Sequence, residues 1–187
     1  MASSRDQGKR MTWAVIGGGN GGQSISGHLA IMGFNVRLYD IVPETINAIQ
    51  DQGGIRVEGT VQGFGHLEFA TTDLKETIEG ADIVVVVAPA LAHANIARSC
   101  APYLKDEQII FIHPGATCGA LEFRKVLDDE KCQANVTLAE ANSLIYACRC
   151  AAPGYAKIFG IKNQLMVAAL PASKSSDVVE KLNTAFP

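Results

Sequence analysis

Five glycines occupy eight consecutive positions in the stretch VIGGGNGG, residues 15–22, and this run constrains the fold more than any other part of the chain. Glycine loses more conformational freedom on folding than other residues, so a run of this kind needs a structural or functional reason. Gly17, Gly19 and Gly22 match the spacing G-x-G-x-x-G. That spacing is informative only when a strand precedes it and a helix follows it.

Both flanks of the glycine run meet that condition. The β-branched run TWAVIG at residues 12–17 predicts a strand, and residues 20–32 predict a helix that ends at Gly33. In this setting the first glycine allows a tight turn, the second lets a pyrophosphate approach the backbone, and the third lets the helix pack on the strand. The helix N-terminus adds free N–H groups and a partial positive charge. The predicted pyrophosphate loop comprises Gly17, Gly18, Gly19, Asn20, Gly21 and Gly22.

Strand-like and helix-like segments alternate along most of the chain. Further strands are predicted at residues 34–40, 81–89 and 108–115, and helices at residues 43–50, 73–80, 91–100, 119–130 and 176–184. Residues 55–70 predict one or two short inserted strands, and the runs after residue 135 predict strands joined by hairpins. This order predicts a Rossmann-type α/β fold, in which a doubly wound, mainly parallel sheet becomes mixed at one edge.

The composition of the chain argues against nucleic acid, membrane and metal as partners. The net charge of −3 gives no electrostatic case for nucleic acid, and no apolar run approaches the roughly 20 residues that span a bilayer. Residues 1–10 are polar and cannot be a secretory signal, so we expect a disordered leader followed by one domain at residues 11–187. Five cysteines without an export signal predict reduced thiols in a cytoplasmic protein. Cys148 and Cys150 lack a second pair at zinc-like spacing, so no metal site is expected.

Asp40 ends the second predicted strand, 23 residues after Gly17. An acidic residue at this place accepts hydrogen bonds from the adenosine ribose of a dinucleotide. A carboxylate there repels a 2′-phosphate, and no basic residue follows it closely, so NAD is preferred over NADP. The alternatives are an ordinary aspartate beside a helix and a glycine-rich turn that holds no ligand.

Three further loops follow the carboxyl ends of later strands, where open α/β sheets bind their ligands. Ala88, Pro89 and Ala90 form a smooth, small-residue segment that could border the ribose and nicotinamide. Candidate substrate contacts are His93, His113 and Glu140. For both histidines we favour the alternative of a packing role, at a helix start and at a strand end respectively.

Four segments in this order resemble the amino-terminal domain of the octopine and nopaline (opine) dehydrogenase family. They are VIGGGNGGQSISGHLA, VVVVAPALAHANIA, HPGATCGALEFRKVL and AEANSLIYACR. The resemblance runs from about residue 11 to about residue 170. It implies an NAD(P)H-dependent reaction in which an amino acid and a 2-keto acid form an imine that hydride reduces to a secondary amine. It also implies that Ala88–Ala90 and the turn of Pro114 and Gly115 border the nicotinamide.

In that family the catalytic histidine and its carboxylate partner belong to a second, helical domain, for which this chain has no motif. The resemblance therefore implies a truncated enzyme that binds NADH without opine turnover. We also expect an exposed apolar domain face around Phe186 and the last helix, through which the chain dimerises or aggregates. Two alternatives are the NAD-binding domain of another two-domain hydroxy-acid dehydrogenase, and a stand-alone NAD-binding or redox-sensing module.

Overall fold

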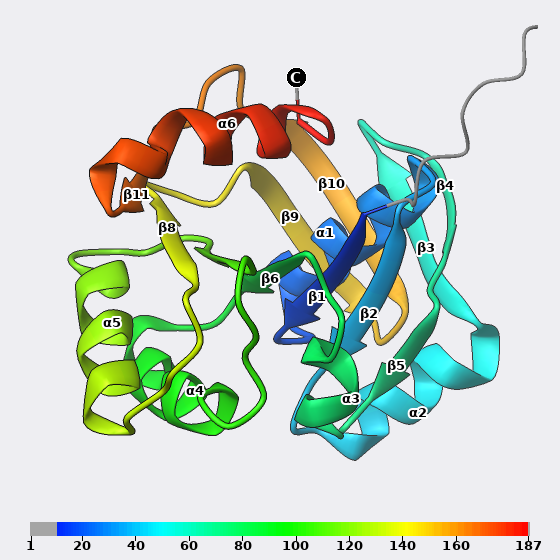
Figure 1. The fold of residues 1–187 in the computed structure, drawn as a ribbon. Helices are drawn as coiled ribbons and strands as arrows, with labels where there is room; N and C mark the ends of the chain where they lie inside the picture. The colour runs from blue at the N-terminus through cyan, green and yellow to red at the C-terminus, as the bar shows by residue number, and fades with distance from the viewer. Residues whose placement is uncertain (1–10, 187) are drawn as a thin grey trace, which may run out of the picture.

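A computed structural model describes residues 11–186, so the predicted leader at residues 1–10 lies outside the described part. The main sheet has seven strands in the order β11-β8-β7-β6-β1-β2-β5 (Figure 1). Its strands are β1 (Thr12–Ile16), β2 (Asn35–Tyr39), β5 (Phe69–Thr71), β6 (Ile83–Val86), β7 (Ile109–Ile112), β8 (Thr137–Ala141) and β11 (Val167–Leu170). All neighbours are parallel except β11, which runs antiparallel to β8. The predicted parallel sheet with a mixed edge is confirmed.

Helices cover both faces of this sheet, and strand β1 shows why. Trp13 and Val15 point into one buried cluster, whereas Ala14 and Ile16 point into another. A strand that is apolar on both faces needs a cover on each side. The first cluster is covered by α1 (Asn20–Ile31), α2 (Pro43–Gln52) and α6 (Ser175–Asn183), and the second by α3 (Leu74–Ile78), α4 (His93–Cys100) and α5 (Gly119–Asp129).

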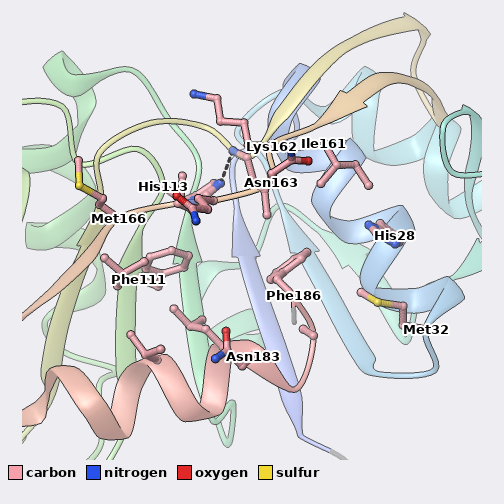
Figure 2. Close-up of a pocket in the computed structure, with 17 residues that line it drawn as sticks. His28, Met32, Phe111, His113, Ile161, Lys162, Asn163, Met166, Asn183 and Phe186 are labelled. Carbon is pink, nitrogen blue, oxygen red and sulfur yellow. Dashed lines mark hydrogen bonds between the residues drawn. The ribbon is translucent and has the colours of Figure 1, made fainter.

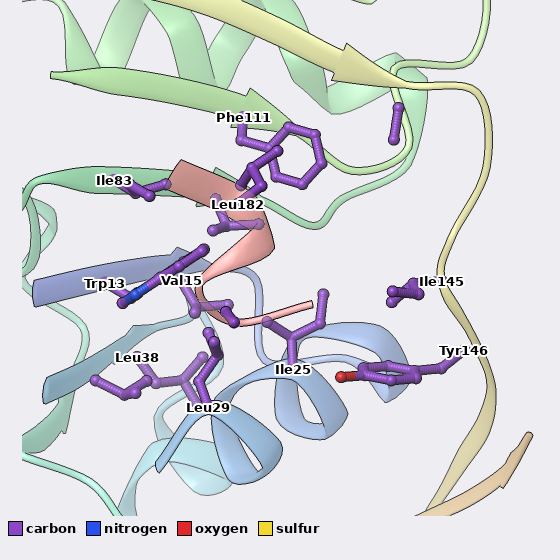
Figure 3. Close-up of a cluster of buried hydrophobic side chains, with 14 of the residues drawn as sticks. Trp13, Val15, Ile25, Leu29, Leu38, Ile83, Phe111, Ile145, Tyr146 and Leu182 are labelled. Atoms are coloured by element: carbon purple, nitrogen blue, oxygen red, sulfur yellow. The ribbon is translucent and has the colours of Figure 1, made fainter. Parts of the chain in front are cut away.

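The first cluster is centred on the large side chains of the central strands. Figure 3 shows Trp13, Val15 and Leu38 on the strands facing Leu29 on α1. Trp13 and Leu29 are both fully buried. A buried leucine of this kind stabilises the fold by about 2–5 kcal/mol relative to alanine. This packing fixes α1, and with it the glycine loop that opens the helix.

A second sheet lies against α1, and it corrects the sequence prediction. Its strands are β3 (Gly54–Gly59), β4 (Gly63–His66), β9 (Tyr146–Ala152) and β10 (Tyr155–Ile161), in the order β4-β3-β10-β9. Residues 55–70 were expected to hold one or two strands but contribute to three, and the hairpin of β9 and β10 does not extend the main sheet. Instead β10 pairs in parallel with β3. The physical reason is close approach to α1, where a Cβ on Gly27 would lie only 2.5 Å from Cγ2 of Val57.

Candidate cofactor site

The three fingerprint glycines have three different surroundings at the carboxyl end of β1. Gly17 has a φ of +111°, and a Cβ there would fall on the carbonyl oxygen of Val87. A Cβ on Gly22 would fall on the carbonyl oxygen of Gly17, so the glycine lets α1 pack on the turn. A Cβ on Gly19 would meet no atom within 4 Å. Gly17 and Gly22 are therefore required by the fold, whereas Gly19 leaves an open space at the helix N-terminus.

That helix N-terminus is free to meet an anion. Gly19 is the N-cap of α1, no side chain caps the helix, and its first turn holds no acidic residue. The first N–H groups of an α-helix have no partner within the helix, and they carry about half a positive charge. A phosphate is the chemical group that fits such an end. The glycine loop therefore has the free N–H groups and the open space that a pyrophosphate needs.

Asp40 follows β2 and faces the glycine loop. Its Oδ2 accepts a hydrogen bond from the Gly18 N–H, and its Oδ1 accepts one from the Val42 N–H at 2.9 Å. The carboxylate is thereby fixed beside the loop, with lone pairs left for hydroxyl donors. Arg37, the nearest preceding cation on the strand, is held by Glu68 at 2.9 Å. Residues 41–44 bring no positive charge, so nothing in this segment favours a 2′-phosphate.

A cavity of about 500 Å³ joins Asp40 to the glycine loop and to the segment after β6. Its wall includes Gly17, Gly19, Ala88 and Pro89, four of the residues predicted to bind the cofactor. Ala90 begins the 3-10 turn Ala90–Ala92 that leads into α4. The side of the cavity beside Asp40 is apolar, because Ile41, which is 78% exposed, and Val42 lie there; such a surface suits a flat base.

Gly21 and Asn20 have structural partners that the sequence did not predict. A Cβ on Gly21 would lie 2.9 Å from Cγ1 of Val87 and 3.2 Å from Cδ1 of Leu144. The Asn20 side chain accepts a hydrogen bond from the Cys150 N–H at 2.7 Å and so attaches α1 to β9. Asn20 therefore offers a phosphate its backbone N–H, whereas its side-chain oxygen is already engaged.

The Pro114 and Gly115 turn lies at the carboxyl end of β7. The Gly115 N–H donates to the Ala141 carbonyl at 3.0 Å, and a Cβ on Gly115 would lie 2.5 Å from the Cβ of Glu140. The turn is therefore held tightly against β8. Its contact with a nicotinamide stays a prediction.

Both candidate histidines are buried, with a backbone partner at Nε2 and none at Nδ1. His93 is 1% exposed and its Nε2 lies 3.2 Å from the Ala88 carbonyl oxygen. His113 is 2% exposed, and its Nε2 accepts a hydrogen bond from the Ile145 N–H at 3.0 Å. Burial, helped by the charge of Lys162, lowers the pKa of His113 to about 4. Burial of both rings is consistent with the packing roles favoured from the sequence, and a contact of either histidine with substrate stays a prediction.

Glu140 lies within β8 and has a partner in the next layer. Its Oε2 accepts a hydrogen bond from the Ala120 N–H at 2.7 Å, at the start of α5. The carboxylate thus caps the N-terminus of α5 from outside the helix, where a negative charge is favourable. A contact of Glu140 with substrate stays a prediction.

One polar side chain at the loop, Gln23, was not singled out from the sequence. Gln23 is 3% exposed on α1, and its Nε2 donates to the Gly18 carbonyl at 2.6 Å. A glutamine on the buried side of a helix is the signal that could have drawn attention to it, because buried amides need partners.

The doubly wound sheet, the uncapped glycine loop and the carboxylate after β2 together define a dinucleotide-binding domain of the Rossmann type. A sequence model of the family described as "NAD-dependent glycerol-3-phosphate dehydrogenase N-terminus" matches residues 12–129. The chain belongs to this family of NAD-binding N-terminal domains, and its cofactor is NAD.

Curated relatives and solved structures add detail to that assignment. The chain is 39% identical over 177 residues to an opine dehydrogenase of Arthrobacter sp. (strain 1C), covering 94% of this chain and 49% of that protein. It is 26% identical to the octopine dehydrogenase of Mizuhopecten yessoensis, over 91% of this chain and 44% of that protein. A structure of octopine dehydrogenase with NADH and pyruvate superposes with a TM-score of 0.75 at 27% identity, covering 85% of this chain and 43% of that one.

These matches confirm the resemblance to the amino-terminal domain of opine dehydrogenases. The chain spans about half the length of the curated relatives it matches.

Proposed function

We propose that this chain is the cofactor-binding half of an NAD(H)-dependent, opine dehydrogenase-like oxidoreductase. The reaction is the reductive condensation of an amino acid with a 2-keto acid, and its reverse. One observation carries the proposal: the match to the Arthrobacter opine dehydrogenase covers 94% of the chain. By contrast, a match to the glycerol-3-phosphate dehydrogenase of Moorella thermoacetica covers only 52%.

Different residues of this chain contact different parts of the cofactor. The open N–H groups at Gly19 and the first turn of α1 bind the pyrophosphate, and Asp40 accepts hydrogen bonds from the adenosine ribose. Ala88 and Pro89 provide a wall without bulky side chains along the way to the nicotinamide. The bound cofactor supplies the hydride. These residues orient it, and the charge of Asp40 disfavours the 2′-phosphate of NADP.

Proton transfer belongs to the half of the enzyme that this chain does not cover. His93 and His113 are buried, and their Nδ1 atoms, although without a hydrogen-bond partner, are shielded from solvent, so neither ring presents an exposed base to a substrate. By resemblance to the family, a histidine and a carboxylate in a second domain move the proton. The 187-residue chain by itself is therefore expected to bind NADH without turnover.

The test uses the full-length reading frame with NADH and a panel of amino acids, each with pyruvate. The proposal expects loss of NADH absorbance only when amino acid and keto acid are both present. Oxidation with the keto acid alone would support a hydroxy-acid dehydrogenase instead. Oxidation with dihydroxyacetone phosphate alone would support a glycerol-3-phosphate dehydrogenase, and binding without any turnover would support a stand-alone module.

An apolar face around the last helix supports the expected association of the isolated chain. A cavity of about 590 Å³ lies between α1, α6 and the segment that joins β10 to β11. Figure 2 shows Phe186 between Phe111 and Met32 at this cavity. Met166, which is 71% exposed, and Val179, which is 37% exposed, also line it. Exposed apolar surface of this kind marks interaction sites.

We propose that the second half of a full-length enzyme covers this face, and that the 187-residue chain alone dimerises through it. Light scattering at increasing protein concentration should show a rising mass that Met166→Ser reduces. Leu91→Ser is the matched control, because Leu91 is 96% exposed and does not line this cavity. A monomer at every concentration would contradict the dimer.

A further inference from the structure

The peptide groups of Gly18 are held from two directions. Its N–H donates to the Asp40 carboxylate, and its carbonyl accepts from Nε2 of Gln23 at 2.6 Å. Gly18 lies between Gly17, which makes the turn, and Gly19, which opens onto the anion site. The orientation of its two flanking peptide planes therefore sets where the N–H groups of the loop point.

Gln23 connects this loop to the second sheet. Its Oε1 accepts a hydrogen bond from the N–H of Gly154 at 2.8 Å, in the turn between β9 and β10. The Gly154 carbonyl in turn accepts from Nε2 of Gln52 at 2.7 Å. A continuous line of hydrogen bonds thus runs from Asp40 through Gly18, Gln23 and Gly154 to the end of α2.

The chemistry of this position requires an amide. The side chain must donate to one backbone carbonyl and accept from one backbone N–H at the same time, which glutamine does and methionine of similar shape does not. Both contacts are buried. Removing the amide would leave a buried carbonyl and a buried N–H without partners. Because an unpartnered buried polar group is unfavourable, the loop and the turn would shift to find other partners.

We propose that Gln23 is a positioning residue for the cofactor, through which the second sheet holds the pyrophosphate loop in its binding geometry. The proposal rests on the role of the glycine loop in NAD binding given above. It assigns a function to the second sheet, which itself contributes no residue to the cavity beside Asp40. Binding of NADH should in turn steady the turn at Gly154.

The first test compares Gln23→Met with Gln52→Met in NADH titrations and urea unfolding. Both variants lose hydrogen bonds to the Gly154 turn, but only Gln23→Met loses the bond to the loop. We expect both to unfold at lower urea, and only Gln23→Met to raise the NADH dissociation constant, by about tenfold. Wild-type affinity in Gln23→Met, or an equal loss in Gln52→Met, would overturn the proposal.

A second test needs no variant and so does not depend on the folding of Gln23→Met. Hydrogen exchange of the wild-type chain should be slower at the Gly154 N–H when NADH is bound. The Thr60 N–H, which donates to the Ile158 carbonyl at 2.8 Å at the end of β3, is the control and should not change. No slowing at Gly154, or equal slowing at both amides, would overturn the proposal. Failure of the wild-type chain to bind NADH would instead overturn the cofactor site itself.

Discussion

Replacing Asp40 with serine isolates the proposed contact with the adenosine ribose. The carboxylate accepts from the Gly18 and Val42 N–H groups, which hold it beside the loop. Serine is too short to span both donors and the ribose, and it carries no charge. A hydrogen bond to a charged group contributes about 1.5–3 kcal/mol, and partial exposure of the site places the loss toward the lower end. Asp40→Ser should therefore weaken NADH binding by about 1–3 kcal/mol, or roughly 5- to 150-fold.

The assay is a fluorescence titration with NADH and with NADPH at one fixed ionic strength. NADPH should lose less affinity than NADH, because the substitution also removes the repulsion of its 2′-phosphate. Asp51→Ser is the matched control: it removes the same charge from an exposed position on α2 and should leave both affinities unchanged. Urea unfolding of each variant separates a change in binding from a change in folding.

An NADH affinity that is unchanged in Asp40→Ser would refute the reasoning. It would mean that the carboxylate serves only the Gly18 and Val42 backbone, and that the ribose lies elsewhere. Equal losses for NADH and NADPH would show a disturbed loop rather than a lost ribose contact.

Three further predictions concern other parts of the site. Gly22→Ala should lower the free energy of unfolding by about 3 kcal/mol or more, because its methyl group would meet backbone atoms. Gly19→Ala should lower it by about 1 kcal/mol or less and yet weaken NADH binding, because its methyl group would enter the open space at the helix N-terminus. Thermal melts and NADH titrations of both variants check this difference. The pKa of His113 is lowered from 6.5 to about 4, so the unfolded chain takes up its proton first on acidification; stability should fall between those pH values, by an amount on the order of 3 kcal/mol. His113→Gln keeps an acceptor for the Ile145 N–H and should remove that slope in urea titrations across pH; an unchanged slope would assign it to other groups. Glu140→Ala should cost about 1 kcal/mol by uncapping α5 while NADH affinity stays the same, and a lost affinity would return Glu140 to the binding site.

The glycine loop and Asp40 could be predicted because the information is local. A strand, a turn with fixed glycine positions and a helix follow one another within residues 12–32, and the spacing of the three fingerprint glycines can be read from that stretch alone. Gly22 is required by an atom of the same unit, the carbonyl oxygen of Gly17, whereas Gly17 is required by Val87 on the next part of the sheet. The placement of Asp40 follows from the next strand, β2, which pairs in parallel with β1.

The second sheet could not be predicted because its pairing is not local. Strand β10 pairs with β3, which lies about a hundred residues earlier in the chain, and alternation of apolar residues does not name a partner strand. The same pattern fits a strand at the edge of the main sheet. The close packing of α1 against Val57 and its neighbours determines that these strands form a second sheet, and this contact exists only in the folded chain.

Gln23 was missed for a related reason. Its partner Gly154 lies 131 residues away, and only that contact turns a polar residue of α1 into a buried connection. The hydrogen bonds of His113 and Glu140 likewise depend on partners in other segments, Ile145 and Ala120. His93 differs, because its partner Ala88 lies five residues earlier in the chain.

A titration of the purified 187-residue chain with NADH, followed by cofactor fluorescence, tests the NAD site most directly. We expect saturable binding at one site per chain, with NADPH binding more weakly. Fluorescence that rises without saturation, or equal binding of NADH and NADPH, would contradict the assignment of the glycine loop and Asp40 as an NAD site.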